Sequence, residues 1–195
     1  MIKKEVLKYI KRVNAISQKS IMSRVHVENG ILCALSEDGS IGLTAPTELR
    51  DGQYNTRGLP DSTIFYSKRP KANGLVDKNG IPLSFIQEVV SPPRASVLLS
   101  IFPDAFHARL FNGISELLKE DIEAEKRTSI KVEKQKNFIN INGNMFYESK
   151  IKRVWDPEEC MDLIISADKK LKHKVLILRP QDAAGVSIVL APVRV

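Results

Sequence analysis

Two of the five Asn-Gly dipeptides in this 195-residue chain, at residues 29–30 and 142–143, lie between short apolar runs that read as strands. Asn and Gly accept the positive φ angles of a two-residue hairpin turn, so this dipeptide between apolar strands is the strongest local signal for a β-hairpin. The stretch "IMSRVHVENGILCALSEDGSIGLTAP" around the first dipeptide therefore predicts an antiparallel meander. Its three strands are expected at residues 21–27, 31–35 and 41–45, with a second turn at Asp38-Gly39.

The segment before this meander has the periodicity of an amphipathic helix. Its apolar residues fall within one sector of the helix: Ile2, Val6, Tyr9, Ile10 and Val13. Its cations fall on the opposite face: Lys4, Lys8, Lys11 and Arg12, joined by Lys19 if the helix extends that far. The first unit is thus predicted to be a helix followed by three antiparallel strands.

The same order of elements recurs about a hundred residues later in the chain. A second helix is expected from apolar residues at helical spacing: Phe106, Leu110, Phe111, Ile114, Leu117 and Leu118. The stretch "TSIKVEKQKNFININGNMFYESKIK" then predicts three strands, separated by turns at Lys136-Asn137 and at Asn142-Gly143. The second unit therefore repeats the first in structure, although hardly in sequence.

A third helix is predicted to begin at Asp156. This residue can act as the N-cap, Pro157 suits the first helical position, and Glu159 completes a capping-box pattern. The acidic cluster "DPEECMD" is assigned to the first turn of this helix, where carboxylates complement the helix dipole, rather than to a metal site. Strands over residues 174–178 and 186–190 follow, so the third unit looks shortened.

The segment between Thr47 and Ser100 is harder to interpret because turn-forming residues interrupt it repeatedly. "TIFYS" and "ASVLLSIF" are expected to be strands, and "PLSFIQEVVS" fits either a short helix or an edge strand. The segment is either a degenerate fourth unit or a connector. We expect two domains, residues 1–100 with an irregular second half and residues 101–195, in an α+β fold of repeated helix-plus-meander units.

Most of the net charge of +7 belongs to the N-terminal segment. Residues 1–28 carry seven cations and two carboxylates, a net +5, whereas the other 167 residues carry a net +2. The cations of the first helix are not interleaved with carboxylates, so they do not serve helix stability. They indicate either an anionic partner or a solvated face that keeps the protein soluble.

Several function classes are disfavoured. The sequence lacks the phosphate-binding glycine loops, the nucleophile elbow and the zinc-binding HExxH pattern, and its three histidines lie far apart, so we expect no enzymatic activity, no cofactor and no metal. Cys33 and Cys160 lie in apolar segments without close pairing, which favours two buried thiols. No apolar run is long enough to span a membrane, which predicts a cytoplasmic protein without a membrane partner.

The end of the chain, "SIVLAPVRV", completes a pattern that resembles the DNA sliding clamps, the processivity factors of replicative polymerases. Bacterial clamps end in a strand with a hydrophobic-Pro-hydrophobic-Arg-hydrophobic signature, which residues 190–195 match with Pro192 and Arg194 in place. The first 45 residues and residues 106–152 are also similar to the helices and strands of a clamp. The short chain fits a compact, phage-type member.

The resemblance implies a closed ring around duplex DNA, with helices lining the hole and a groove that docks peptides of the polymerase and the clamp loader. It assigns sequence-independent phosphate contacts to Lys4, Lys8, Lys11, Arg12 and Lys19. It assigns the wall of the groove to Val189, Leu190, Pro192, Val193 and Arg194. The ring would be a homo-oligomer, a trimer if a fourth unit lies between Thr47 and Ser100 and a tetramer otherwise.

Two alternatives remain open at this level, and one feature of the sequence opposes DNA binding. The terminal strand is also explained as an edge strand closed off by Pro192, which cannot donate a ladder hydrogen bond. The acidic residues Glu158, Glu159 and Asp162, expected on the third helix, would repel DNA. The chain is therefore alternatively an interaction or regulatory protein that never encircles DNA and binds a replication or host protein through its C-terminal strand.

Overall fold

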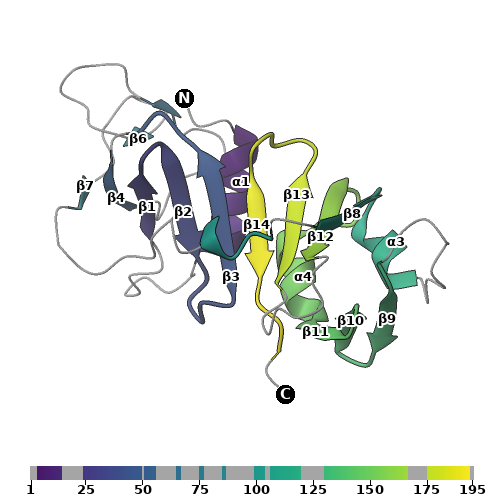
Figure 1. The fold of residues 1–195 in the computed structure, drawn as a ribbon. Coiled ribbons are helices and arrows are strands. Elements are labelled where there is room, and N and C mark those ends of the chain that lie inside the picture. Colours follow the sequence, from purple (N-terminus) through teal and green to yellow (C-terminus); the bar gives the residue numbers. More distant parts are fainter. Residues whose placement is uncertain are drawn as a thin grey trace. The chain divides into compact units, whose positions relative to one another are not determined.

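The computed structural model describes residues 4–14, 24–49, 51–55, 65–66, 75–76, 85–86, 99–103, 106–119, 130–166 and 175–193. The chain forms two compact units, Met1–Ser100 and Ile101–Val195. Figure 1 shows the elements of both units, with colours that follow the sequence.

The first unit opens with α1 (Lys4–Val13) and continues with an antiparallel meander (Figure 1). The strands are β1 (Arg24–Glu28), β2 (Ile31–Leu35), β3 (Ile41–Pro46), β4 (Gly52–Asn55) and β7 (Phe85–Ile86). Within this unit they follow the order β7-β4-β1-β2-β3, and β5 (Phe65–Tyr66) pairs separately with β6 (Leu75–Val76). The predicted helix and three-strand meander are therefore confirmed, while Ile2 and residues 21–23 lie outside the described residues.

The Asn29-Gly30 turn sets the register of this sheet. Both residues have positive φ angles, 52° and 75°, as the hairpin requires. The register places Leu32 opposite Ala45, and both residues are buried. Helix α1 packs against β2 and β3, so its buried side chains, Val6, Leu7, Tyr9, Ile10 and Val13, close the core of the unit.

The segment between Thr47 and Ser100 contains only short strands and no helix before residue 99, as far as the described residues extend. "TIFYS" contains β5, and "PLSFIQEVVS" contains β7, which pairs with β4 as an edge strand. The strand expected in "ASVLLSIF" is wrong at its described end, because residues 99–100 are helical and residue 101 lies in a turn. Leu99 and Ile101 are exposed there instead of packing inwards from a sheet.

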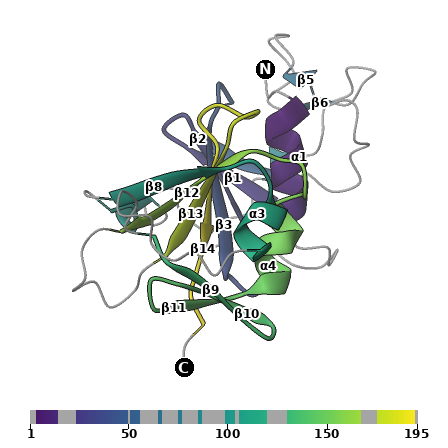
Figure 2. The ribbon, with the colours of Figure 1, turned by 90° about the vertical axis from the view of Figure 1, so that its right-hand side faces the viewer.

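The described residues of the second unit form two antiparallel sheets and two helices. Figure 2 shows these elements after a rotation of 90°. The larger sheet follows the order β14-β13-β12-β8 within this unit, and the smaller follows β11-β10-β9. The elements of the first half are β8 (Phe106–Phe111), α3 (Ile114–Lys119), β9 (Val132–Gln135), β10 (Phe138–Ile141) and β11 (Asn144–Tyr147). Those of the second half are α4 (Glu148–Val154), β12 (Met161–Ser166), β13 (Leu176–Pro180) and β14 (Ser187–Leu190).

The helix predicted from Phe106 to Leu118 is wrong in its first half, where the structure has the strand β8. Apolar residues at 106, 108 and 110 also fit a two-residue period, and pairing along the whole of β12 decides for the strand. The helix α3 begins only after Gly113, where a Cβ would collide with the carbonyl oxygen of Pro157. The Glu116 carboxylate accepts a hydrogen bond from the Asn112 amide (2.8 Å), which caps this start.

The helix predicted from Asp156 is also wrong, because the helix of the third unit, α4, ends at Val154. The Glu159 carboxylate does accept a hydrogen bond from the Asp156 amide (2.9 Å), but the pair closes only a turn. The indole of Trp155 donates to the Glu159 carbonyl (2.7 Å), and β12 begins two residues later. Burial of β12 side chains in the sheet core outweighs the local helix signal.

The described residues contain three units of one helix and three antiparallel strands: α1 with β1–β3, α3 with β9–β11, and α4 with β12–β14. The third unit is complete rather than shortened, because the strand β12 replaces the expected helix. The α+β fold of repeated helix-plus-meander units is confirmed. The core of the larger sheet in the second unit includes a cluster of Ile164, Val175, Ile177 and Val189, against which Phe102 packs.

The two cysteines differ in their surroundings. Cys33 is buried in β2, and burial, together with the charge of Glu28, raises the pKa of its thiol to about 12. Cys160 is exposed, contrary to the expectation of a second buried thiol, because it lies in the turn before β12 instead of in an apolar helix.

Candidate nucleic-acid interface

The cations of α1 lie on the side of the helix opposite its buried residues. Lys8, Lys11 and Arg12 are half-buried, and the carboxylate of Glu5 lies in the first turn. Lys4 is the first residue of the helix, and Lys19 lies outside the described residues. The structure therefore brings together three of the five predicted phosphate contacts and places a fourth, Lys4, on the same helix.

Tyr9 fixes two of these cations in place. Its ring is fully buried, the Lys8 ammonium lies 4.6 Å from the ring centroid and the Arg12 guanidinium lies 5.3 Å from it. Long basic side chains cover apolar surface with their aliphatic stems while the charged group stays in a polar environment, and a cation over an aromatic face gains electrostatic stabilisation. The contacts with the buried Tyr9 ring therefore hold Lys8 and Arg12 in defined positions on the surface of α1.

A second basic helix, α4, was not predicted. It buries Ile151 and Val154 and exposes Ser149, Lys152 and Arg153. The two cations lie in its last turn, where they complement the helix dipole. The acidic surface expected on the third helix is therefore wrong, because Glu158 and Glu159 belong to a turn and Asp162 to β12. The spacing of Ile151 and Val154, with basic residues between them, was the available signal.

The charge around α4 is concentrated. Residues 131–153 carry six cations and two carboxylates, a net +4 in 23 residues. Together with the +5 of residues 1–28 this accounts for more than the whole net charge of +7, so the remainder of the chain is net acidic. Each compact unit thus carries its own basic segment.

Glu148, at the start of α4, is held between two lysines of this segment. Its carboxylate lies 2.5 Å from the Lys152 ammonium and 3.5 Å from that of Lys134. The hydrogen bond from Lys152 is the main cause of a lowered pKa of Glu148, and Lys134 adds to it, while burial opposes them. The carboxylate therefore stays ionised at neutral pH, and the trio keeps one net positive charge.

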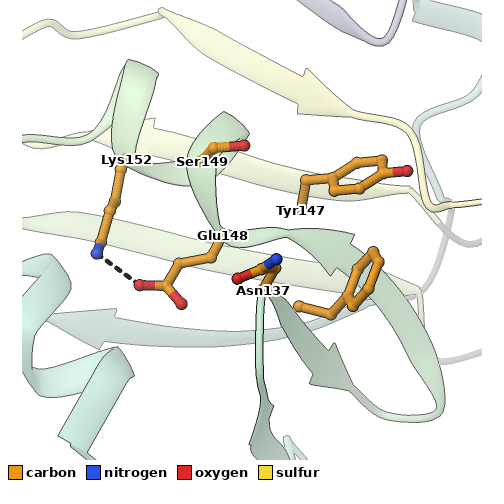
Figure 3. Close-up of a pocket in the computed structure, with 6 residues that line it drawn as sticks. Asn137, Tyr147, Glu148, Ser149 and Lys152 are labelled. Carbon is orange, nitrogen blue, oxygen red and sulfur yellow. Dashed lines mark ion pairs between the residues drawn. The ribbon is translucent and has the colours of Figure 1, made fainter.

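A pocket of about 410 Å³ opens beside this trio, between the β9–β10 turn and the start of α4 (Figure 3). Its lining combines an aromatic pair with polar groups: Asn137, Phe138, Tyr147, Glu148, Ser149 and Lys152. The rings of Phe138 and Tyr147 lie 4.9 Å apart between centroids. The sequence had pointed to no function for these residues.

The five residues predicted to wall a peptide groove divide into three groups. Val189 and Leu190 are buried in β14, with Val189 in the core cluster. Pro192 and Val193 follow the strand and are half-buried, and Arg194 lies outside the described residues. The amide of Val193 donates to the Met145 carbonyl of β11 (2.7 Å), so the segment after β14 crosses to the smaller sheet.

The strand β8 forms one edge of the larger sheet within the second unit and pairs there with β12. Phe106 and Leu110 project from it and are each 48% exposed. Exposed large apolar side chains on an edge strand invite pairing with another chain, so this edge is a candidate joint between subunits.

Membrane-spanning and metal-binding features are absent from the part of the chain that the structure describes. None of the helices there is long and apolar enough to cross a membrane. No three potential ligands from His, Cys, Asp and Glu gather among these described residues in a group that could hold a metal ion.

Two solved structures share the fold over the whole chain. The DNA polymerase III subunit beta sliding clamp of Bartonella birtlesii, bound to griselimycin, is 13% identical with a TM-score of 0.53, and the match covers 100% of this chain and 64% of the clamp. The DNA polymerase III subunit beta of Borrelia burgdorferi, in complex with a natural product, is 12% identical with a TM-score of 0.52, and the match covers 100% and 63%.

The chain therefore has a clamp-like fold, as the resemblance implies, and spans about 64% of the length of the first of these clamps. No known protein family and no curated protein matches the sequence. At 13% and 12% sequence identity, the similarity to these two clamps shows the fold alone.

Proposed function

We propose that the protein is a sliding-clamp-like processivity factor that encircles duplex DNA without sequence preference and docks peptides of a polymerase or clamp loader. The observation that carries this proposal is the clamp-like fold over the whole chain, with helix-plus-meander units repeated three times. Both similar structures are subunits of DNA polymerase III, which favours a replicative polymerase as partner. We propose no enzymatic activity and a cytoplasmic location.

The phosphate-binding residues are proposed to be Lys4, Lys8, Lys11, Arg12 and Lys19, joined by Lys152 and Arg153 of α4. All of these residues except Lys19, which lies outside the described residues, belong to two amphipathic helices, each with its apolar side buried in its own unit. Cations fixed on helices attract the backbone of any sequence, because counterion release depends on phosphate charge and not on bases. This attraction weakens as salt rises.

We propose that several copies of the chain associate into a closed homo-oligomer, with the edge strand β8 as one joint. The exposed Phe106 and Leu110 supply the apolar contact that such a joint needs. Three visible units favour a tetramer, and a fourth unit between Thr47 and Ser100 would favour a trimer.

Peptide docking is proposed at the end of the chain. Pro192 and Val193 offer partly accessible apolar groups beside β11, and Val189 and Leu190 support them from the core. Hydrophobic anchors of a short peptide carry most of the binding energy of such a small interface. Arg194 would complete the wall.

The decisive experiment compares retention on closed circular and linearised DNA of the same sequence. The protein is loaded, then washed with salt high enough to remove unspecific contacts. A ring stays on circular DNA and slides off linear ends. Equal retention on both forms would contradict encirclement. Polymerase capture without any retention would instead favour the interaction protein that binds through its C-terminal strand.

A further inference from the structure

The solvent face of the small sheet β11-β10-β9 carries an aromatic pair that duplex binding does not use. Phe138 and Tyr147 are register partners, so their side chains project from the same face. The adjacent register partners, Ile139 and Phe146, project from the other face and are buried. Tyr147 is 40% exposed, so the pair faces solvent while the core lies behind it.

Lysines lie beside this pair. The Lys150 ammonium lies 5.1 Å from the centroid of the Tyr147 ring, and Lys136 is exposed in the turn that precedes Phe138. Lys152 is about half exposed and lines the pocket.

Two carboxylates belong to the same surface. Glu148 lines the pocket, and the exposed Glu133 projects from the same face of the sheet as the aromatic pair. Lys134 does not contribute, because it is the register partner of the buried Ile139 and projects from the other face. Three lysines against two carboxylates leave this surface with one net positive charge.

The pocket beside the pair offers the remaining features of a base-binding site. Its volume of about 410 Å³ exceeds that of one nucleobase, and Phe138 and Tyr147 are both among its lining residues. Figure 3 shows Tyr147 with the polar groups of the pocket. The Asn137 amide and the Ser149 hydroxyl line it with hydrogen-bond donors and acceptors. Aromatic side chains on a sheet face with cations beside them suit a single strand, because bases stack on the rings while phosphates meet the cations.

We propose that this face binds single-stranded nucleic acid, with unpaired bases stacked on Phe138 and Tyr147 and phosphates on Lys136 and Lys150. This goes beyond the duplex binding proposed for the two basic helices and does not depend on ring closure. A strand of unpaired nucleotides fits better than a peptide, because the surface joins stacking rings to a net positive charge. A purely structural role of the aromatic pair is the competing explanation.

The test uses the full chain, a fluorescently labelled oligothymidylate of about ten nucleotides, and a labelled duplex, measured by fluorescence anisotropy. Tyr147→Ala is expected to weaken binding of the single strand roughly 5- to 150-fold, the range for losing one stacked base. Tyr147→Phe keeps the ring and should bind as the unaltered protein does. Leu99→Ala, at an exposed apolar residue of the first unit, is the matched control and should also leave single-strand binding unchanged.

The duplex separates this inference from the proposed function. Tyr147→Ala should leave duplex binding unchanged, whereas the double substitution Lys8→Glu and Lys11→Glu should weaken it. Duplex binding without any single-strand binding would overturn only the inference, and single-strand binding without duplex binding would overturn only the proposed function.

Unchanged oligothymidylate binding in Tyr147→Ala would assign the pair to sheet stability, all the more so if its melting temperature falls. Loss of polymerase capture in that variant, with oligothymidylate binding intact, would assign the face to a peptide. Either result overturns the inference.

Discussion

Glu148 illustrates how a single residue joins charge, stability and surface in this protein. Its carboxylate begins α4, pairs with Lys152 one turn later in the helix and with Lys134 of β9, and so ties the helix to the sheet. Without it, two lysines and their neighbours would repel one another beside the pocket. The residue is thus expected to stabilise the second unit while leaving the surface positive.

The stability of the protein should depend on the ionisation of Glu148. Its pKa is lower in the folded chain than the ordinary value of 4.5. A lowered carboxyl pKa stabilises the fold above the ordinary value, and this contribution is lost as pH falls through the lower, folded-state value. Thermal melts from pH 7 downward should therefore show wild type more stable than Glu148→Gln at neutral pH, with the difference shrinking below pH 4.5.

Glu158→Gln provides the control for that comparison, since Glu158 is an exposed glutamate of the turn after Trp155. Its melting temperature should follow wild type at every pH. A constant gap between wild type and Glu148→Gln down to strongly acidic pH would show that the carboxylate acts through packing and not through its charge.

At the scale of elements, α1 and the segment after β14 carry the proposed contacts with DNA and with protein. Both are fixed by packing: α1 through its buried side chains and the ring of Tyr9, and the terminal segment through the bond from Val193 to Met145. The proposed contact residues are half-buried rather than fully buried, so changing them should cost less in folding than changes in the core.

Reversing two charges of α1 should weaken duplex binding. Lys8→Glu with Lys11→Glu removes two proposed phosphate-binding cations, so the slope of log affinity against log salt should become shallower by about 0.9 for each phosphate that is no longer neutralised. Titrations at several salt concentrations measure it. Lys8→Arg with Lys11→Arg retains the charge and should retain the slope. Equal affinity in the charge-reversed and wild-type proteins would identify the cations as a solvated face.

Removing residues 192–195 should abolish polymerase binding and leave the fold intact. Pro192 and Val193 are only half-buried, whereas the strand itself keeps Val189 and Leu190 in the core. Val189→Ala should in contrast lower the free energy of unfolding by about 1 to 3 kcal/mol, as expected for truncating a buried side chain. Thermal melts and a polymerase pull-down on the same proteins distinguish the two. Full polymerase binding after truncation would leave the segment as an ordinary closing strand.

The sequence predicted the turns and meanders well, and the helices less well. Asn29-Gly30 and Asn142-Gly143 need positive φ angles, which few other residues accept, so their hairpins could be located to within a few residues. The apolar residues from Phe106 to Leu110 fit both periods, and only pairing with β12 decides between them. At Asp156 a correct capping interaction was present, but it closes a turn, because the next residues are needed in the sheet core.

The candidate site was predicted unevenly for a related reason. The α1 cations could be found because they lie close together in sequence on one amphipathic helix. The surface around Phe138 and Tyr147 depends on the β10–β11 register and on the position of α4. Neither of these can be predicted from composition or from the spacing of apolar residues, because the pair is exposed.

For the whole molecule, assembly decides between the two proposed functions. The ring that we propose requires copies of the chain to associate, whereas the alternative interaction protein does not. We propose the exposed apolar residues of β8 as the place where this association can be disrupted.

The protein is expected to be a closed homo-oligomer in solution, and Leu110→Glu should convert it to monomers. A charge at this 48% exposed position costs the folded monomer little but would be buried without a partner in a joint between sheet edges. Solution mass from light scattering measures both proteins, with Lys136→Gln as an exposed control. A monomeric mass for wild type at tens of micromolar in low salt would contradict the ring.

Trp155 makes the tryptophan fluorescence of the protein specific to one of its two units. It is the single tryptophan of the chain, it is fully buried, and it belongs to the unit Ile101–Val195. Its emission therefore reports directly on the folding of that unit, whereas far-ultraviolet circular dichroism sums over both. Coincident transitions by the two probes would mean that the halves melt as one cooperative body, and separate transitions would mean that each half is a folding entity of its own.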